Sequence, residues 1–310
     1  MNREQENSLK PDQIIAELSA LNIGSILIGE PLKNHTTFKI GGPCVAMVLP
    51  EDYEQAAEAL RYLRDREVLH MVMGNGSNLL IKDSGYPGVI VKLGENLSKV
   101  RFEGTRIIAQ AGAQLTKTSK AAIERSLEGM EFSSGIPGNI GGAITMNAGA
   151  YGGEIKDIVE SVKVIDPNGQ IVDILAEDMN FRYRNSRVQD EGLIVLEATF
   201  ALKEGVPEQI QAKYQELSEA RNSKQPLEYP SAGSIFKRPP GYFAGKLIDD
   251  AGLRGYRYKN AMVSEKHCGF IVAVGPSSYE EVSHVIEHVQ QVVQEKFGVS
   301  LETEVRIIGE

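Results

Sequence analysis

The segment GIPGNIGGAITMNAGAYGGE, residues 135–154, contains seven glycines and no base, histidine or cysteine, and its single acid is the final Glu154. Glycine adopts dihedrals that other residues avoid and lets a ligand approach the main chain, while Pro137 fixes one bend. The small apolar run AITMNAGA indicates a packed segment, and buried backbone groups need hydrogen-bond partners that a ligand can supply. The segment therefore predicts a ligand-binding stretch of backbone, with a mobile surface loop as the alternative.

Composition limits the class of protein. The chain has 310 residues, 42% hydrophobic and 24% charged, which is typical of a globular protein of two or three domains. A net charge of −9 argues against a nucleic-acid partner. Because no apolar run approaches the length of a membrane span and the N-terminus lacks the apolar core of a secretory signal, we expect no membrane partner. Cys44 and Cys268 lie far apart in apolar surroundings, which favours buried free thiols in the cytoplasm over disulfides or a metal cluster.

The hydrophobic pattern mixes helices and strands without strict strand–helix–strand alternation, which favours an α+β fold. The sequence KEGVPEQ, residues 203–209, indicates a domain boundary. A hairpin with a Pro-Asn-Gly turn is expected at residues 159–175. Helices are expected at 12–21, 52–66, 116–129, 207–222 and 278–297, and strands at 44–50, 68–73, 88–93, 106–112, 193–202, 269–275 and 301–308.

The segment MGNGSNLLI, residues 73–81, follows an apolar strand and invites a dinucleotide-fold interpretation. Gly74 and Gly76 match the first two glycines of that fingerprint, but Leu79 stands where the third belongs and no helical run follows. The backbone N–H groups and short side chains of this polar loop could still wrap an anion. An ordinary turn is the alternative.

The segment FRYRNSRV, residues 181–188, concentrates arginines in an acidic protein. In an extended conformation, Arg182 and Arg184 would share one face, opposite Phe181 and Tyr183. The arginine guanidinium forms bidentate hydrogen bonds with carboxylates and phosphates. A solvated surface strand with weak ion pairs is the alternative.

Two further segments carry polar side chains of interest. PSAGSIFKRPPG, residues 230–241, has no G-x-S-x-G elbow, so a hydrolase serine is not indicated. Its serine hydroxyls, held in a rigid turn, could donate a proton or simply cap the turn. In LETEVRII, residues 301–308, strand alternation would place Glu302, Glu304 and Arg306 on one face, where a surface ion pair is the simplest interpretation.

Taken in order, the segments GNGSNLLI, SSGIPGNIGGAITMNAGAYGGE, YRNS, PSAGSIFKRP, AGKLIDDAGLRG and EVRIIG resemble the UDP-N-acetylenolpyruvoylglucosamine reductase family. The resemblance implies a two-subdomain FAD-binding fold of the vanillyl-alcohol-oxidase type plus a C-terminal α+β substrate-binding domain. It implies an N-terminal helical segment at 1–34, an FAD-binding domain at 35–203 divided near 95–105, and a substrate-binding domain at 204–310. The last strand, 301–308, would return to the active site.

The resemblance also implies a reaction. NADPH reduces FAD, and the flavin N5 then delivers hydride to C3 of UDP-N-acetylglucosamine enolpyruvate, giving UDP-N-acetylmuramate for peptidoglycan synthesis. By motif match, Arg184 is the cation that stabilises charge at C2, Ser234 is the acid that protonates C2, and Glu304 is the carboxylate beside the reacting atoms. None of the five histidines lies in a covalent-flavin motif, so we expect non-covalent FAD. We expect a monomer and no metal.

The remaining site residues also come from the motif match. The substrate contacts expected are Tyr183, Lys237, Arg238 and Lys246. The longer form of the family has an asparagine where Arg238 stands and carries extra segments with a tyrosine over the diphosphate, so this chain resembles the shorter form. The cofactor contacts expected are Gly74, Asn75, Gly76, Ser77, Asn78, Leu79, Ser134, Gly135, Ile136, Pro137, Gly138, Gly141, Gly142, Ala143, Asn147 and Gly149.

Two other functions stay open at this point. One is a different flavin oxidoreductase on the same fold, such as an alcohol oxidase that uses oxygen. The other is a nucleotide-binding protein without catalytic activity. A flavin spectrum and an oxidation assay separate the three.

Overall fold

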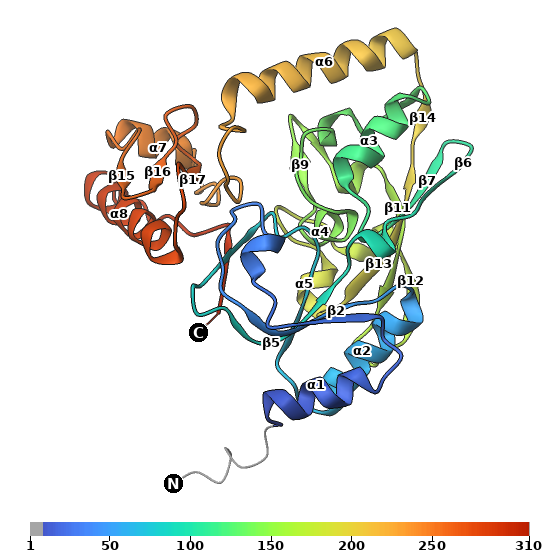
Figure 1. Cartoon of the computed structure of the whole chain (residues 1–310). Helices are drawn as coiled ribbons and strands as arrows, with labels where there is room; N and C mark the ends of the chain where they lie inside the picture. The colour runs from blue at the N-terminus through green and yellow to red at the C-terminus, as the bar shows by residue number, and fades with distance from the viewer. Residues whose placement is uncertain (1–8, 310) are drawn as a thin grey trace. The chain divides into compact units, whose positions relative to one another are not determined.

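The structure is a computed structural model that describes residues 9–309. Residues 1–8, with which the predicted N-terminal helical segment begins, and residue 310 lie outside the described residues. Figure 1 shows the chain coloured by residue number. Contacts group the described residues into two compact units: unit 1 comprises 9–28, 45–75 and 88–219, and unit 2 comprises 29–44, 76–87 and 220–309. The functional domain boundaries expected from the sequence stay a prediction.

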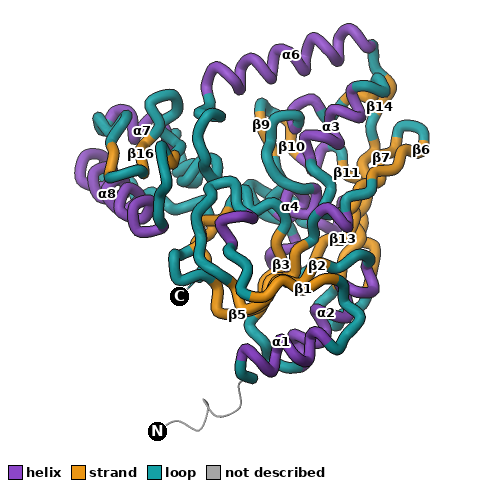
Figure 2. Tube along the Cα trace, viewed as in Figure 1, coloured by secondary structure: helices purple, strands orange, loops and turns teal. Residues whose placement is uncertain are grey.

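The first sheet of unit 1 has four strands in the order β1-β2-β5-β3 (Figure 2). Helix α2 packs into the same core through the stripe that the sequence indicates, because its alanines and leucines recur every three or four residues. Asp52 caps this helix by accepting the N–H of Gln55 at 2.7 Å. The elements are α1 (Pro11–Ser19), β1 (Ser25–Ile28), β2 (Cys44–Leu49), α2 (Tyr53–Asp65), β3 (His70–Met73) and β5 (Tyr86–Lys92).

The second sheet of unit 1 has five strands in the order β12-β11-β13-β7-β6, and each neighbouring pair is antiparallel. The predicted hairpin at 159–175 is confirmed: the Asp166 carboxylate closes its turn by accepting the N–H groups of Asn168 and Gln170, both at 2.8 Å. Helix α4 packs against β13 of this sheet. The elements are β6 (Val100–Glu103), β7 (Arg106–Gln110), α4 (Ile140–Thr145), β11 (Val159–Ile165), β12 (Ile171–Leu175) and β13 (Ile194–Ala201).

The helix predicted at 116–129 is wrong beyond residue 123. Helix α3 ends at Ile123, Ser126 adopts a left-handed φ of 59°, and the following residues form a strand, β8, that pairs with β14. Backbone pairing therefore overrides the helical pattern there. In the remaining labels η marks a 3₁₀ helix. The other elements of unit 1 are η2 (Glu95–Leu97), α3 (Leu115–Ile123), β8 (Leu127–Glu128), η3 (Glu131–Ser133), β9 (Gly149–Ala150), β10 (Gly153–Glu154), η4 (Ile155–Asp157), η5 (Ala176–Met179), α5 (Arg187–Glu191) and β14 (Lys203–Glu204).

Unit 2 has its own apolar core, built on the sheet β15-β16-β17 and helices α7 and α8. The helix expected at 278–297 is confirmed: the Ser278 hydroxyl accepts the N–H of Glu281 at 3.2 Å, and Gly298 ends the helix with a φ of 66°. Helix α6 crosses the sequence boundary between the units. The elements are η1 (Leu32–His35), α6 (Pro207–Lys224), α7 (Ala244–Asp250), β15 (Arg257–Tyr258), β16 (Ala261–Val263), β17 (Ile271–Ala273) and α8 (Tyr279–Phe297).

The C-terminal strand is shorter than the sequence indicates. Strand β18 covers Arg306–Ile308 and pairs in parallel with β4 (Leu79–Ile81). Leu301 and Val305 are buried, but Ile307, which should share their face, is 41% exposed. The expected alternation over 301–308 therefore breaks, and the residues before β18 run as a loop.

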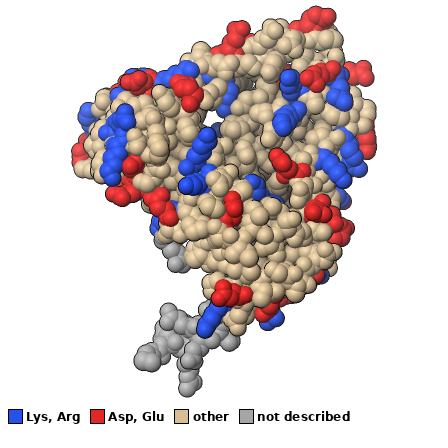
Figure 3. All heavy atoms as spheres, viewed as in Figure 1, with Lys and Arg blue, Asp and Glu red and all other residues tan. Residues whose placement is uncertain are grey.

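The described residues contain no helix long and apolar enough to cross a membrane. Across residues 9–309, no group of three histidine, cysteine or acidic side chains could hold a metal ion. Cys44 and Cys268 are confirmed as buried free thiols. On the face shown in Figure 3, basic and acidic side chains are interspersed.

Candidate active site

The glycine-rich segment of unit 1 is held by backbone hydrogen bonds to residues 111–115. Ile140 N–H donates to Ala113 O and Gly141 N–H to Ala111 O, both at 2.9 Å. A Cβ added to Gly141 would lie 3.1 Å from the Cβ of Ala111, closer than an ordinary contact, so glycine suits this close approach. Gly142 is exposed, and a Cβ added there would meet no atom within 4 Å. The main chain at Gly142 is therefore open to a ligand.

Asn139 lies at the base of this segment and was missed by the sequence analysis. Its Nδ2 donates to Gly112 O at 2.6 Å, whereas its buried Oδ1 has no hydrogen-bond partner among residues 9–309. A Cβ added to Gly74 would lie 3.4 Å from the Asn139 side chain, so the first glycine of the polar loop is its neighbour. A buried acceptor without a donor is unusual. An N–H-bearing ligand such as a flavin ring fits this position. The sequence signal for it was an asparagine, one of two in residues 135–154, that lies directly between Gly138 and Ile140 of the glycine-rich run.

The other predicted cofactor contacts fall in three places. Asn75 ends a stretch of unit 1, whereas Gly76, Ser77, Asn78 and Leu79 belong to unit 2. Asn78 is brought together with the C-terminal segment: its Nδ2 donates to Glu304 O at 3.1 Å, and its carbonyl accepts the N–H of Arg306 at 3.0 Å. In unit 1 the loop between η3 and α4 holds Ser134, Gly135, Ile136, Pro137 and Gly138, α4 holds Ala143, and the chain after it holds Asn147 and Gly149.

Arg184 lies in a tight turn of unit 1, so the extended face predicted for Arg182 and Arg184 is wrong. Arg182 and Asn185 exchange backbone hydrogen bonds at 3.1 Å in both directions, and Arg184 between them has a left-handed φ of 53°. The two guanidinium groups consequently diverge. Arg182 forms an exposed bidentate pair with Asp190 at 2.6 and 2.8 Å, whereas Arg184 is half-buried with its Nη1 3.5 Å from Gly149 O.

Side-chain hydrogen bonds fasten the Arg184 turn to the end of α4. The buried Ser186 hydroxyl donates to Thr145 O at 2.9 Å. Gln189 Nε2 lies 3.0 Å from Thr145 O and 3.1 Å from Arg184 O. A left-handed arginine persists where its surroundings hold it, and such strain clusters at functional sites. Tyr183, 54% exposed, lies with its ring centroid 5.3 Å from the Arg184 guanidinium carbon.

Ser234 and Glu304 are brought together within unit 2. The backbones of Ser234 and Phe270 form an antiparallel β-bridge. The carbonyl of the next residue, Ile235, accepts the N–H of Glu304 at 2.7 Å. Both side chains are half-buried. A neighbouring imidazole, His267, accepts the N–H of Gly269 through Nδ1 at 3.1 Å, and burial lowers its pKa, which favours neutral imidazole.

Three predicted substrate-binding cations of unit 2 are exposed and have neighbours of their own. Lys237 Nζ lies 3.1 Å from Glu302 Oε2. Lys246 pairs with Asp250, one turn later in α7. The Arg238 guanidinium lies 3.9 Å above the Phe243 ring. Exposed pairs of this kind are weak, so a strongly charged anion can displace them.

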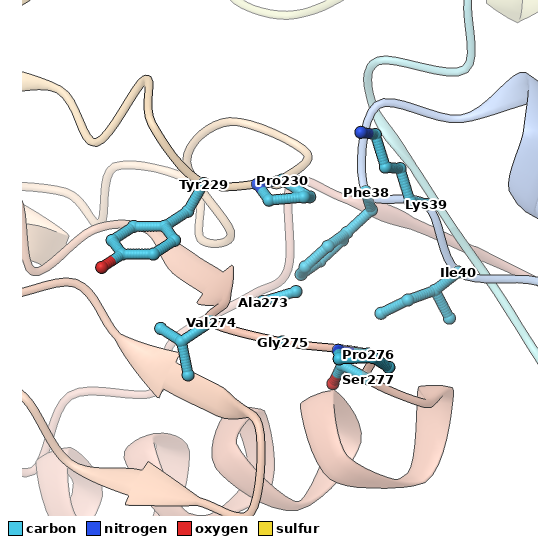
Figure 4. Close-up of a pocket in the computed structure, with 10 residues that line it drawn as sticks. All are labelled: Phe38, Lys39, Ile40, Tyr229, Pro230, Ala273, Val274, Gly275, Pro276 and Ser277. Atoms are coloured by element: carbon cyan, nitrogen blue, oxygen red, sulfur yellow. The ribbon is translucent and has the colours of Figure 1, made fainter.

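A cavity of about 350 Å³ lies within unit 2, away from these residues. Figure 4 shows the Phe38 side chain pointing into it, with Tyr229, Pro230 and Pro276 around it. None of the predicted site residues lines it. The lining of the cavity is mainly apolar.

Family models and curated relatives match both parts of the chain. Residues 225–308 match the model described as UDP-N-acetylenolpyruvoylglucosamine reductase, C-terminal domain. Residues 45–175 match an FAD binding domain. The chain is 50% identical over 290 residues to a UDP-N-acetylenolpyruvoylglucosamine reductase of Caldanaerobacter subterraneus, covering 94% of this chain and 96% of the relative. It is 48% identical to that of Enterococcus faecalis, covering 95% and 98%.

Solved structures agree with the sequence comparisons. The crystal structure of the Thermus caldophilus UDP-N-acetylenolpyruvylglucosamine reductase has a TM-score of 0.79 and 34% identity, covering 92% of this chain and 98% of that one. The berberine bridge enzyme of Eschscholzia californica has a TM-score of 0.50 and 20% identity, covering 63% of this chain and 44% of that one. This second likeness concerns the fold alone. Together the matches confirm the predicted α+β class, with an FAD-binding fold of the vanillyl-alcohol-oxidase type and a C-terminal substrate-binding domain.

Proposed function

The chain belongs to the UDP-N-acetylenolpyruvoylglucosamine reductase family, and on this premise we propose that it uses NADPH to reduce the enolpyruvyl ether of UDP-N-acetylglucosamine enolpyruvate to UDP-N-acetylmuramate. It is an FAD-containing oxidoreductase of peptidoglycan precursor synthesis. The observation that carries the proposal is identity of 50% across 94% of the chain, which includes both the FAD-binding and the C-terminal matches. The cytoplasmic, monomeric state stays a prediction.

Bound FAD supplies hydride-transfer chemistry between NADPH and the enolpyruvyl ether. The residues that would hold it are the predicted contacts at 74–79 and 134–149, with Asn139 added. The open main chain at Gly142 supports this assignment, and so does Asn139 Oδ1, which has no hydrogen-bond partner among residues 9–309. Both fit a ligand that hydrogen bonds to backbone and amide groups. Few charged side chains lie in this segment to compete with it.

Arg184 is proposed as the cation that stabilises the reacting substrate. Hydride addition at C3 leaves negative charge at C2 that delocalises into the adjacent carboxylate. A fixed guanidinium lowers the energy of that charge most where it needs no reorganisation. The half-buried side chain and the backbone held at a φ of 53° support this role.

Ser234 is proposed as the acid that protonates C2, with Glu304 assisting proton delivery. A serine hydroxyl is a weak acid, but the developing carbanion is far more basic, and a relay can return the proton to the serine. The hydrogen bond from Glu304 N–H to Ile235 O supports the pairing, because it holds the two residues on adjacent segments of unit 2. Tyr183, Lys237, Arg238 and Lys246 are proposed to bind the substrate carboxylate and diphosphate.

One assay tests the function. The purified protein should show a flavin spectrum, and it should consume NADPH in steady state when UDP-N-acetylglucosamine enolpyruvate is added, with UDP-N-acetylmuramate as the product. Reduced enzyme that reacts rapidly with oxygen but not with the enolpyruvyl sugar would favour an oxidase. A colourless protein that cannot be reconstituted with FAD would favour a nucleotide-binding protein.

A further inference from the structure

Asn147 is a buried amide whose polar atoms are engaged within unit 1. It is 1% exposed and adopts a left-handed φ of 41°. Its Nδ2 lies 2.8 Å from Glu154 Oε2 and 3.3 Å from Arg182 O, and its Oδ1 accepts the N–H of Lys156 at 3.0 Å. Both ends of the amide are thus used internally. Asn147 therefore ties the strand that carries Glu154 to the backbone of the Arg184 turn.

Glu154 lies across a two-strand hairpin from the carbonyl that Arg184 reaches. It is the register partner of Gly149 in β9–β10, and Arg184 Nη1 lies 3.5 Å from Gly149 O. Lys156 Nζ lies 2.9 Å from its carboxylate. The pKa of Glu154 is lowered, first by the Lys156 hydrogen bond and also by the Asn147 hydrogen bond and the charge of Arg184. Glu154 is consequently a carboxylate at neutral pH, within the field of Arg184.

We propose that Glu154 and Asn147 are positioning residues for Arg184. Asn147 fixes the carboxylate of Glu154 relative to the turn, and the carboxylate orients the Arg184 guanidinium toward one geometry. The inference rests on the proposed role of Arg184 in the reaction. Neither residue needs to touch the substrate.

The physical reason lies in the flexibility of arginine. Its long side chain loses much rotamer freedom when fixed, and a turn alone fixes the backbone without fixing the guanidinium. A charged acceptor nearby selects one orientation before the substrate arrives, which is how preorganised groups act in transition-state stabilisation. Lys156 holds the carboxylate of Glu154, and Asp157 Oδ2 accepts the Glu154 backbone N–H at 2.8 Å, so both the side chain and the backbone of Glu154 are held.

A double-mutant cycle tests the inference on the holoenzyme. Glu154→Gln, Arg184→Lys and the double variant are compared by stopped flow in both half-reactions. We expect Glu154→Gln to slow flavin reoxidation by the enolpyruvyl sugar about tenfold while flavin reduction by NADPH changes less than about twofold, since misplacing one group costs rate mainly in the step that uses it. In the Arg184→Lys background the same change should have no further effect.

The matched control is Glu160→Gln. Glu160 on β11 also pairs with a basic side chain, its Oε2 lying 2.8 Å from Arg106 Nε, in the same unit. We expect it to leave both half-reactions unchanged. Equal slowing by Glu154→Gln in the wild-type and Arg184→Lys backgrounds, or no slowing in either, would overturn the inference.

A spectroscopic readout keeps the test valid if Glu154→Gln lowers overall stability. The side-chain Nε–H signal of Arg184, assigned by its loss in Arg184→Lys, is recorded by NMR in the oxidised holoenzyme. We expect Glu154→Gln to shift and broaden it and Glu160→Gln to leave it unchanged. An unaltered signal in Glu154→Gln would refute the positioning role. If the wild type is not reoxidised by the enolpyruvyl sugar, the proposed function fails, and this signal still reports on Arg184 alone.

Discussion

The conformations and candidate roles of Arg184 and Ser234 depend on residues that lie far from them in the sequence. The spacing of FRYRNSRV predicts two arginines on one face, yet a two-residue turn sends Arg182 to Asp190 and leaves Arg184 half-buried. A left-handed arginine cannot be predicted from composition, because the hydrogen bonds from Ser186 and Gln189 that hold the turn come from residues folded back onto α4. The candidate roles of Arg184, Ser234 and Glu304 came from motif order, and neither alternation nor spacing would have selected them.

Ser234→Ala separates proton donation from cofactor chemistry. Flavin reduction by NADPH should proceed at the wild-type rate, whereas reoxidation by the enolpyruvyl sugar should slow about 10²- to 10⁴-fold because the acid is missing. Stopped-flow absorbance of the flavin follows both steps. Ser223→Ala on α6, an exposed serine of the same unit, is the control and should leave both unchanged. Wild-type reoxidation in Ser234→Ala would exclude the serine as donor.

Tyr53 links stability to alkaline pH. Its hydroxyl donates to Glu197 Oε2 at 3.0 Å and accepts from Gln110 at 3.1 Å, and burial raises its pKa to about 12 from 10.0. The folded state therefore holds this proton more tightly than the unfolded chain. Its contribution is complete below pH 10 and is lost as the pH rises toward 12.

Tyr53→Phe should accordingly cost about 1–2 kcal/mol in the free energy of unfolding at neutral pH, because Glu197 and Gln110 lose a partner. Urea unfolding at a series of pH values measures it. Above pH 10 the wild type should lose stability more steeply than the variant, so the two curves converge. Parallel curves over that range would show that Tyr53 titrates alike in both states.

At the scale of elements, local signals predict the helices with clear caps and mislead where backbone pairing decides. Helix α8 follows its capping serine and apolar stripe, as the sequence indicates. Residues 124–129 follow a helical pattern, but the pairing of β8 with β14 decides their conformation. Residues 301–305 alternate like a strand, but backbone hydrogen bonds to residues 235–237 hold them as a loop. A pattern read over a few residues cannot predict pairing with a strand that lies far away in the sequence. The same limit hides α4, which is six residues long and rich in glycine.

Gly142→Ala in α4 tests the cofactor segment. A methyl group there meets no atom of residues 9–309 within 4 Å, and alanine is the better helix former, so unfolding of the FAD-free protein should not become easier. FAD affinity should fall at least about tenfold, because the methyl occupies the space through which a ligand reaches the main chain. Titration of the FAD-free protein with FAD gives the dissociation constant.

Gly104→Ala is the control for that variant. Its Cβ would also meet nothing within 4 Å, but Gly104 has a φ of 60°, which strains alanine. The control should lose about 1 kcal/mol in stability and keep its FAD affinity. Wild-type FAD affinity in Gly142→Ala would show that the cofactor does not approach there.

The whole molecule combines an FAD-binding part with a family-specific C-terminal part. The net charge argued against a nucleic-acid partner, and the mixed hydrophobic pattern favoured an α+β fold. The order of six short motifs indicated the family that the comparisons confirm. The grouping of residues 29–44 and 76–87 with the C-terminal residues was not foreseen, because it depends on pairings such as β4 with β18. The candidate residues come from both units, Arg184 from unit 1 and Ser234 and Glu304 from unit 2.

The most direct measurement of the central claim is anaerobic reoxidation of the reduced flavin. Enzyme reduced with NADPH and freed of NADP⁺ is mixed with UDP-N-acetylglucosamine enolpyruvate, and the flavin absorbance and the sugar product are followed together. The account predicts rapid return of the oxidised spectrum, with one UDP-N-acetylmuramate formed per flavin. A flavin that stays reduced with this substrate, while oxygen reoxidises it readily, would contradict the account.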